Sequence, residues 1–242
     1  MGRLTLKHLS DKYEFSGLGR RAVPGIPFLV GDIAKSVEGI QAAFTDIDTV
    51  LHLAAPAEIG WEENMPGGIH GTLHVYEAAR IAGVKRVVFF SSGMVQLAYE
   101  WDPDLPYGTL ANGPDDKIPS TWKILEVDAP VRPDTPFAVA KLFGENLGRY
   151  YADKYGISTL VVRSGAVLAE DRPLIRRHHP GFLSQADCVQ VIDKCLSAPA
   201  SLKYDIFNAM SENKLLWRST EHTKKTLGWK PTGSSDNYPR WP

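Results

Sequence analysis

Short apolar runs rich in Val, Ile, Leu and Phe alternate along the chain with longer segments whose apolar positions recur at helical spacing. Such runs, bounded by turn-forming residues, are typical of strands, and the periodic segments are typical of helices. The predicted strands are 13–18, 27–31, 49–55, 86–92, 158–164 and 204–209, and the predicted helices are 3–10, 35–44, 66–83, 135–155, 185–197 and 219–227. This alternation predicts an α/β fold with a Rossmann-like, doubly wound parallel sheet and helices on both faces.

Residues 96–134 interrupt the alternation. They hold six prolines and sustain no apolar period. A stretch of that length without secondary structure is usually a functional loop or disordered. No internal repeat or linker divides the remaining chain, so we expect a single domain over 1–242 with 96–134 as a long loop.

Composition narrows the class of protein. A net charge of −1 argues against a nucleic-acid partner, because binding to phosphates needs a basic surface. No apolar stretch has the length of a membrane span and no leader opens the chain, so we expect a soluble, cytoplasmic protein without a membrane partner. Cys188 and Cys195 lie seven residues apart in a predicted helix, about 10 Å along its axis and too far for a disulfide. We expect both to be core thiols.

Four segments carry a resemblance to a known family. They are "VGDI" (30–33), "LHLAA" (51–55), "GTLHVYEAARIAGVKRVVFFSS" (71–92) and "DAPVRPDTPFAVAKLFGENLGRYYADKYG" (128–156). In this order and spacing they resemble the extended short-chain dehydrogenase/reductase enzymes, the NAD-dependent epimerase/dehydratase family. The likeness is closest to its uronate dehydrogenase-like branch, to which "GFLSQADCVQVIDKCLSAP" (181–199) and "TLGWKP" (226–231) are also similar. That branch oxidises hexuronic acids to aldaric acid lactones with a nicotinamide cofactor.

The start of the chain departs from the family pattern. Members open with a strand and a Gly-x-x-Gly-x-x-Gly turn that leads into a helix facing the cofactor pyrophosphate. "MGRLTLKHL" resembles only the end of that turn, with Gly2 as its third glycine. The first strand, which belongs between 13–18 and 49–55, is absent, and two internal sheet edges should be unpaired. Either Met1 is an internal methionine of a longer protein, or the protein is naturally shortened.

The resemblance also implies a set of cofactor-binding residues. Asp32 corresponds to the residue that binds the adenine amino group, with Ile33 beside the ring. Leu53, Ala54 and Ala55 correspond to the stretch that lines the ribose and phosphates, and Ser164 and Lys141 complete the set.

Charge favours one form of the cofactor. An acidic residue at the end of the second strand holds the ribose of NAD, whereas arginine accommodates the 2′-phosphate of NADP. This chain has Gly19 at that position, followed by Arg20 and Arg21. We therefore expect NADP or NAD, with NADP favoured. The alternative is that both arginines are solvated loop residues.

Ser92, Phe137 and Lys141 occupy the positions of the family's catalytic serine, tyrosine and lysine. In the family the tyrosine exchanges a proton with the substrate oxygen, the lysine lowers the phenol pKa and binds the nicotinamide ribose, and the serine orients the substrate. Phe137 keeps the ring but lacks the hydroxyl, a loss worth about 10² to 10⁴ in rate. Two replacements for the missing proton donor remain open. One is a hydroxyl from Tyr99, Tyr107, Tyr150 or Tyr151, and the other is a water held by Ser92 and Lys141.

Three functions therefore stay open. The first is an NAD(P)-dependent oxidoreductase acting on a sugar or uronate-like sugar acid, with activity impaired by Phe137. The others are an NAD(P)-binding protein without hydride chemistry and a nucleotide-sugar epimerase or dehydratase.

The later part of the chain, about 165–242, is expected to contribute the substrate side. Arg177, or its neighbour Arg176, falls where the branch places a substrate arginine and could pair with a uronate carboxylate, unless this is a basic solvated loop. The adjacent His178 and His179 lack an acidic or cysteine partner nearby, so we expect no metal. Members of the family commonly form homodimers through the helices predicted at 66–83 and 135–155.

Overall fold

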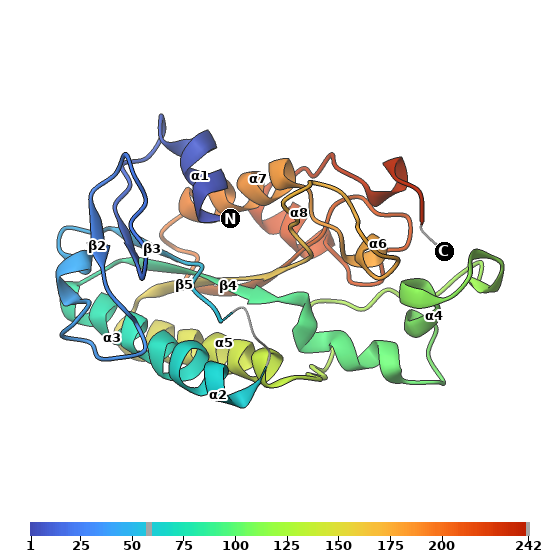
Figure 1. Cartoon of the computed structure of the whole chain (residues 1–242), viewed down its shortest axis with the longest axis horizontal. Helices are drawn as coiled ribbons and strands as arrows, with labels where there is room; N and C mark the ends of the chain where they lie inside the picture. The colour runs from blue at the N-terminus through green and yellow to red at the C-terminus, as the bar shows by residue number, and fades with distance from the viewer. Residues whose placement is uncertain (57–59, 241–242) are drawn as a thin grey trace.

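Parallel strands form the framework of the computed structural model, which describes residues 1–56 and 60–240 (Figure 1). One sheet has four strands in the order β3 (Thr49–His52), β4 (Arg86–Ser92), β5 (Ser158–Ser164) and β6 (Tyr204–Ala209). A second sheet pairs β1 (Gly17–Gly19) with β2 (Phe28–Val30). Every pair in both sheets is parallel, which confirms the predicted α/β class.

The two sheets do not hydrogen-bond to each other. Within the described residues no strand pairs with the free edge of β1 or with that of β3. The sequence predicts this gap, because the first strand of the family pattern belongs between these two edges. The framework is therefore a Rossmann-like fold whose sheet is divided at that point.

Side chains of β4 alternate between the two faces of the larger sheet. Val88 and Phe90 pack in a core with α1 (Gly2–Leu9) and α7 (Gln185–Leu196). Val87 packs on the other face with α3 (Gly71–Ala82) and α5 (Pro136–Tyr155). Figure 1 shows these helices as two layers around the strands. Each large apolar side chain fully buried in these cores contributes roughly 1.5–3 kcal/mol, so both layers stabilise the sheet.

Several predicted elements are shorter than expected. Of the predicted strand 13–18, only Gly17 and Leu18 belong to β1, and Tyr13 instead donates its hydroxyl to Asp193 on α7, at 2.7 Å. The predicted helix 35–44 is reduced to the 3-10 helix η1 (Gln41–Phe44), because Ser36 accepts from the Gly39 backbone in a local turn. β3 ends at His52, three residues before the predicted end.

The predicted helix 66–83 has two parts. A π-helical stretch, η2 (Asn64–His70), follows the short α2 (Trp61–Glu63) and precedes α3. Pro66 lies inside η2 and lacks a backbone donor. Gly68 lies against α5: a Cβ at this position would be 2.9 Å from that of Ala140. Glycine therefore permits the close approach of η2 to α5.

The prediction of a long loop at 96–134 is wrong. This segment folds into a lobe, residues 93–134, that contains η3 (Gly93–Trp101), α4 (Tyr107–Asn112) and η4 (Asp115–Lys117). The Tyr107 ring stacks on that of Trp217 with 4.7 Å between centroids, inside a separate apolar cluster. The lobe was missed because its helices are too short to show a period and because it packs on residues far away in the sequence.

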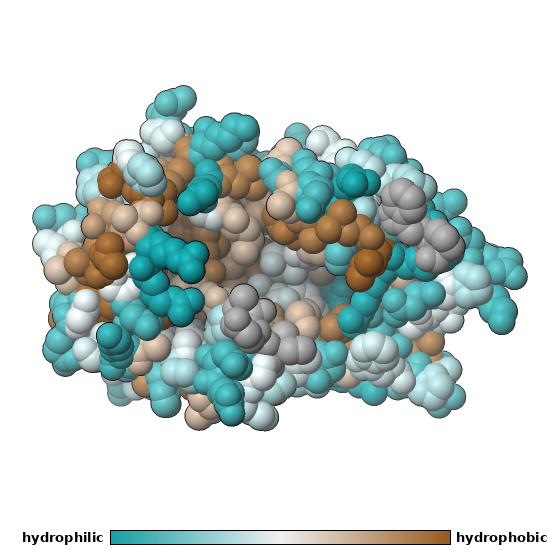
Figure 2. Space-filling view, in the orientation of Figure 1, coloured by the Kyte–Doolittle hydropathy of each residue, from teal (hydrophilic) through white to brown (hydrophobic). Residues whose placement is uncertain are grey.

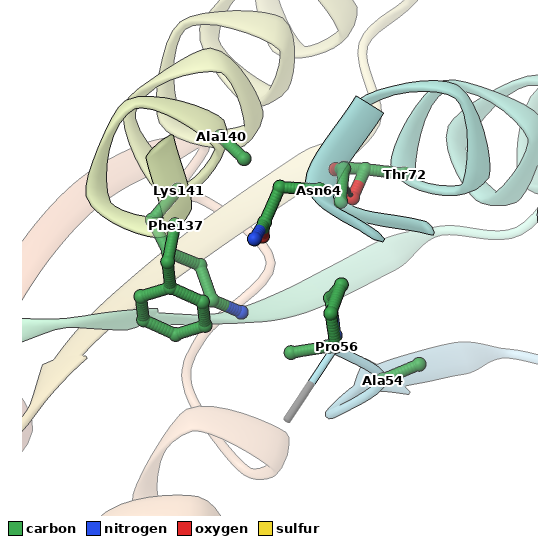
Figure 3. Close-up of a pocket in the computed structure, with 9 residues that line it drawn as sticks. Ala54, Pro56, Asn64, Thr72, Phe137, Ala140 and Lys141 are labelled. Carbon is green, nitrogen blue, oxygen red and sulfur yellow. Dashed lines mark hydrogen bonds between the residues drawn. The ribbon is translucent and has the colours of Figure 1, made fainter. Parts of the chain in front are cut away.

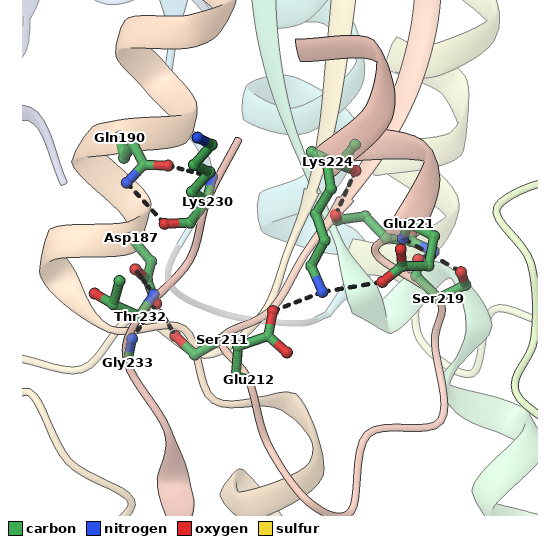
Figure 4. A network of polar contacts seen from close by, with 12 residues as sticks. Asp187, Gln190, Ser211, Glu212, Ser219, Glu221, Lys224, Lys230, Thr232 and Gly233 are labelled. Carbon is green, nitrogen blue, oxygen red and sulfur yellow. Dashed lines mark hydrogen bonds and ion pairs between the residues drawn. The ribbon is translucent and has the colours of Figure 1, made fainter. Parts of the chain in front are cut away.

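The C-terminal segment is held by the buried carboxylate of Asp187 (Figure 4). Asp187 accepts from the Ser211 hydroxyl at 2.5 Å and from the backbone N–H groups of Thr232 and Gly233 at 2.8 and 2.9 Å. These bonds join α7 to the residues after β6 and after α8 (Glu221–Leu227). Two further short helices, α6 (His178–Gly181) and η5 (Ser235–Asn237), lie on this side.

Cys188 and Cys195 are buried free thiols in the α7 core, as expected. Burial raises the pKa of each thiol to about 12, so both remain protonated near neutral pH.

Candidate functional site

A small pocket lies where the residues after β3 meet η2 and the first turns of α5 (Figure 3). Its lining combines small apolar residues with a few polar groups: Ala54, Ala55, Pro56, Asn64, Gly68, Thr72, Phe137, Ala140 and Lys141. The carboxyl ends of parallel strands are where open α/β sheets bind their ligands. Figure 2 shows the molecular surface hollowed on the face viewed, with apolar surface on much of the wall.

Lys141 is the buried cation of this pocket. Its side chain is 7% exposed, and Nζ donates to the carbonyl oxygen of Phe90, on β4, at 2.7 Å. Burial lowers the pKa of Lys141 to about 8, and the nearby Glu145 carboxylate opposes this shift. The amine can therefore change protonation close to physiological pH.

Phe137 stands one helical turn before Lys141. The helix begins there because Thr135 accepts from the backbone N–H of Ala138 at 3.2 Å and Pro136 occupies the first position. Lys141 Nζ lies 5.4 Å from the centre of the Phe137 ring. In Figure 3 both side chains leave α5 on the same side, and the Lys141 amine extends toward Pro56. The i, i+4 spacing thus brings both side chains to one face.

Ser92 and Ser91 differ in their surroundings. Ser92 ends β4, is half-buried, and its hydroxyl oxygen accepts from the Met94 backbone N–H at 3.1 Å. Ser91 is buried and donates to Glu145 Oε1 at 2.5 Å. Glu145 in turn pairs with Arg163, on β5, through two bonds of 2.7 and 3.0 Å. Ser91 therefore belongs to a buried network, and Ser92 is the more open hydroxyl.

Two of the tyrosines considered as replacement acids lie too far away. Tyr150 and Tyr151 are thirteen and fourteen residues beyond Phe137 on α5, roughly 20 Å along the helix axis. Their hydroxyls contact Tyr155 and Glu77. The prediction that either could supply a proton to the Lys141 pocket is wrong for this geometric reason.

Tyr99 and Tyr107 belong to the 93–134 lobe. Their hydroxyls donate to the backbone carbonyls of Pro130 and Lys123, at 3.0 and 2.9 Å. Each hydroxyl would have to give up this bond before it could serve the Lys141 pocket.

The residues expected at the adenine end of a dinucleotide occupy the ends of β1 and β2. Arg20 and Arg21 are exposed directly after β1. Asp32 accepts from the Ala34 backbone N–H at 3.0 Å. Ile33 packs closely against Gly71 of α3, where a Cβ would lie 2.7 Å from its Cγ1. Ile33 is thus engaged in the core as well as lying beside Asp32.

The other expected cofactor residues follow the central strands. Gly2 opens α1 close to Leu53: a Cβ on Gly2 would lie 3.8 Å from Leu53 Cδ1. Ala54 and Ala55 are small and exposed. Ser164 ends β5 and its hydroxyl donates to the Ser91 carbonyl oxygen at 3.5 Å. These positions meet at one edge of the sheet.

The residues present fit a nicotinamide dinucleotide. The small residues after β3 leave room at the strand ends, and the exposed arginines after β1 suit a phosphate. Lys141 has three N–H donors, of which one bonds to Phe90, so its amine retains donors for a ribose hydroxyl. Among the described residues, no group of three or more His, Cys, Asp or Glu side chains is arranged to hold a metal.

The expected substrate arginine already has partners. Arg177 Nε donates to Glu100 Oε2 at 2.7 Å, and its guanidinium stacks over the Trp101 ring at 4.9 Å. Arg176 instead bonds to Asp115 and to the Gly113 carbonyl, in the 93–134 lobe. Glu100 was not foreseen from the sequence. A charged residue in the apolar run "GMVQLAYEW" was the available signal.

Comparison with known proteins defines the class. The model of the NAD dependent epimerase/dehydratase family matches residues 1–196, so the chain belongs to that family. It is 29% identical to an L-arabinose 1-dehydrogenase (NAD(P)(+)) of Haloferax volcanii, over 97% of this chain and 93% of that protein. It is 32% identical to a uronate dehydrogenase of Agrobacterium fabrum, over 86% of this chain and 70% of that protein.

A solved structure agrees with this placement. It is a mutant uronate dehydrogenase from Agrobacterium tumefaciens complexed with NAD, with a TM-score of 0.78 and 29% identity, over 98% of this chain and 82% of that one. The family, the uronate dehydrogenase-like branch and the fold predicted from the sequence are therefore confirmed. In the described residues no helix is both long and apolar enough to cross a membrane.

Proposed function

We propose that this protein is an NAD(P)-dependent oxidoreductase that acts on a sugar or sugar acid. The observation that carries the proposal is the buried Lys141 amine beside Phe137, in a pocket at the strand ends of a fold shared with sugar and uronate dehydrogenases. When bound, the nicotinamide supplies the hydride acceptor or donor.

The chain's own residues provide binding and proton handling. The Lys141 amine holds the ribose, and Ser92 orients the substrate oxygen with a hydroxyl that is half-buried at the end of β4. Because Phe137 has no ionisable group, we propose that a water between Ser92 and Lys141 carries the proton. The low pKa of Lys141 supports this role, since the amine can accept a proton near pH 8.

Arg20 and Arg21 support a preference for NADP. Both are exposed at the end of β1, and Gly19 supplies no carboxylate there. Guanidinium groups bind phosphate oxygens in paired hydrogen bonds. The 2′-phosphate of NADP would form these bonds, and the 2′-hydroxyl of NAD would not. The segment 165–242 supplies the substrate side through Arg177.

Phe137 also favours a second candidate function, a cofactor-binding protein without hydride transfer. Loss of the hydroxyl removes the group that the family uses to move the proton. In that case the pocket would bind the cofactor equally well, and no sugar would be oxidised.

We further propose that the protein is a cytoplasmic homodimer that pairs through α3 and α5. The two helices contact each other and carry exposed apolar side chains: Leu73, Ile81, Val139, Tyr150 and Tyr155. Burial of such a face against a second copy would remove this surface from water.

The test incubates the protein with a panel of aldoses and uronates and with NADP or NAD. The absorbance of the reduced nicotinamide measures the reaction. Cofactor binding is measured in parallel by titration. Reduction with any sugar supports the oxidoreductase, and tight cofactor binding without reduction supports the second candidate.

A further inference from the structure

Asp115, the first residue of η4 in the 93–134 lobe, joins three parts of the chain. Its Oδ1 atom accepts from Arg176 Nη1 at 3.0 Å and from Arg240 Nη1 at 2.9 Å. Arg176 belongs to the segment after β5, and Arg240 belongs to the C-terminal segment, residues 229–240. Residues 61 and 125 positions away in the sequence therefore meet at one carboxylate, and these three side chains form the Asp115 junction.

Both arginines of the junction also bond to the backbone of the lobe. Arg176 Nη1 donates to the Gly113 carbonyl oxygen at 2.9 Å, and Arg240 Nη2 donates to that of Leu110, on α4, at 3.0 Å. A guanidinium carries five N–H donors in one plane, so each arginine can hold a carboxylate and a carbonyl at once. The side chain of Arg240 is only 10% exposed, whereas that of Asp115 is 63% exposed. Arg240 thus packs into the fold, while Asp115 stays open to solvent.

The C-terminal segment also holds α6 and the residues before it. α6 contacts both α4 and η5, and its His179 is buried. Tyr238, directly after η5, donates its hydroxyl to the Asp171 carbonyl oxygen at 3.2 Å. The Tyr238 ring meets that of Phe182 edge-on, with 6.2 Å between centroids. The segment 171–182 is therefore fixed by the C-terminal segment at both of its ends.

α6 in turn lies against the strand ends of the candidate site. A Cβ on Gly165 would collide with the Gly181 carbonyl oxygen, so the end of α6 packs directly on the residue after β5. The same oxygen accepts from the Ala166 N–H at 2.7 Å. Ser164, the last residue of β5, is paired in register with Ser92, the last residue of β4. A shift of α6 would therefore move the wall beside Ser92.

Resting on the proposed function, we propose that Asp115 and Arg240 are positioning residues for the substrate. Through them the C-terminal segment holds α6, and with it one wall of the substrate side, in a fixed place relative to Ser92. Neither residue belongs to the groups proposed to bind the cofactor or to move the proton. Loss of the Asp115 junction should therefore weaken substrate binding and leave cofactor binding unchanged. Because Asp115 is exposed, high salt should weaken the junction by screening.

Hydrogen–deuterium exchange of the full chain tests the junction without any substrate, because exchange rates report how often a segment opens locally. Asp115→Asn and Arg240→Gln should each speed exchange of the backbone amides at 174–183 by at least about threefold, a change expected for the loss of a partly exposed ion pair. The amides of β5 should stay unchanged. Asp116→Asn neutralises the exposed neighbour on η4, so it is the matched control and should have no effect.

Steady-state kinetics with galacturonate and NADP then tests the link to the substrate. KM for galacturonate should rise at least about threefold in both variants, with kcat and the Kd of NADP within about twofold of the parent. The rise in the double variant should be smaller than the product of the two single rises, because both changes break one junction. Arg240→Lys keeps a charge and N–H donors for Asp115 and Leu110, so it should restore most of the parental KM.

Each other outcome counts against the proposal. Unchanged exchange at 174–183 in both variants, or an equal effect of Asp116→Asn, overturns the junction. If Arg240→Gln does not fold, Asp115→Asn and high salt on the parent protein decide, and exchange that neither of them speeds overturns it.

The kinetic result separates the junction from the proposed function. Faster exchange with an unchanged KM overturns the positioning role while the oxidoreductase stands. A parent that oxidises no sugar, with exchange still faster in the variants, overturns the proposed function and with it the substrate role, and leaves the junction as a brace of the fold.

Discussion

Lys141 Nζ lies 5.4 Å from the centre of the Phe137 ring, one turn away on α5, where the family's pattern places a tyrosine hydroxyl within reach of the amine. The helix thus keeps the lysine of the family's catalytic pair but lacks the tyrosine hydroxyl that acts as the acid. Phe137 lines the pocket and is half-buried, so its ring is not enclosed on every side.

Phe137→Tyr should raise the turnover of glucuronate or galacturonate at least about tenfold over the parent, since a general acid typically contributes 10² to 10⁴. Steady-state rates with NADP and NAD measure the effect. Phe137→Leu is the control, because it alters the ring and adds no hydroxyl. If the tyrosine variant binds cofactor normally and its turnover does not rise, the result favours a cofactor-binding protein without hydride transfer over an oxidoreductase.

Replacement of Arg20 and Arg21 by glutamate should invert the cofactor preference. The parent should bind NADPH more tightly than NADH, because two guanidiniums suit the 2′-phosphate and a carboxylate suits the 2′-hydroxyl. Fluorescence titration with both cofactors measures the ratio. Arg172→Glu should leave the ratio unchanged, and equal affinities before and after the double change would refute the assignment.

Lys141→Met should stabilise the cofactor-free protein most at neutral pH. The pKa of Lys141 is depressed from 10.5 to about 8 in the folded protein. Above pH 10.5 the amine is neutral in both the folded and the unfolded state, and burying it carries no charge penalty. As pH falls from 10.5 through 8 the penalty grows to its full size, and the folded protein loses stability. The penalty for burying the charge is about 3 kcal/mol at pH 7 and about 1 kcal/mol at pH 10. The advantage of the Met variant, measured by urea unfolding, should therefore shrink by about 2 kcal/mol between these pH values. An advantage that is constant with pH would contradict this.

Arg163→Met should destabilise the protein by about 3–5 kcal/mol, because it leaves the buried Glu145 carboxylate without its cation. Arg149→Met, which breaks an exposed pair on α5, should cost no more than about 1 kcal/mol. Chemical unfolding of both variants compares the two pairs. Similar losses would mean that the buried pair stabilises the protein no more than the exposed one.

Ile81→Lys should convert the proposed homodimer into a monomer, because it places a charge on the exposed apolar face of α3. Ile124→Lys, an equivalent change on the 93–134 lobe, should leave the dimer intact. Light scattering at micromolar concentration distinguishes the two states. A monomeric parent with cofactor bound would rule out the α3 and α5 interface.

The bounds of β4, β5 and β6 were predicted to the residue, whereas none of the helices in the 93–134 lobe was predicted. β4 and β5 are buried on both faces along nearly their whole length, so their apolar runs are continuous and their ends are sharp. The short β1 and β2 pair over few residues, and their neighbours adopt turns that propensity does not reveal.

Only the part of the candidate site that depends on the spacing of residues along one helix could be predicted from the sequence. Phe137 and Lys141 share a helix face by sequence separation alone. Arg177 donates to Glu100 of the 93–134 lobe, although the two residues are 77 positions apart in the sequence. A contact between residues so distant in the chain leaves no local pattern.

Transfer of a deuterium label tests the central proposal most directly. Galacturonate deuterated at the carbon to be oxidised is incubated with the protein and NADP or NAD, and the reduced cofactor is analysed by mass spectrometry. We predict that the reduced cofactor carries the deuterium, and that Phe137→Tyr transfers it faster. Cofactor that is bound by both proteins yet stays oxidised and unlabelled, with this sugar and with the wider panel, would contradict the account.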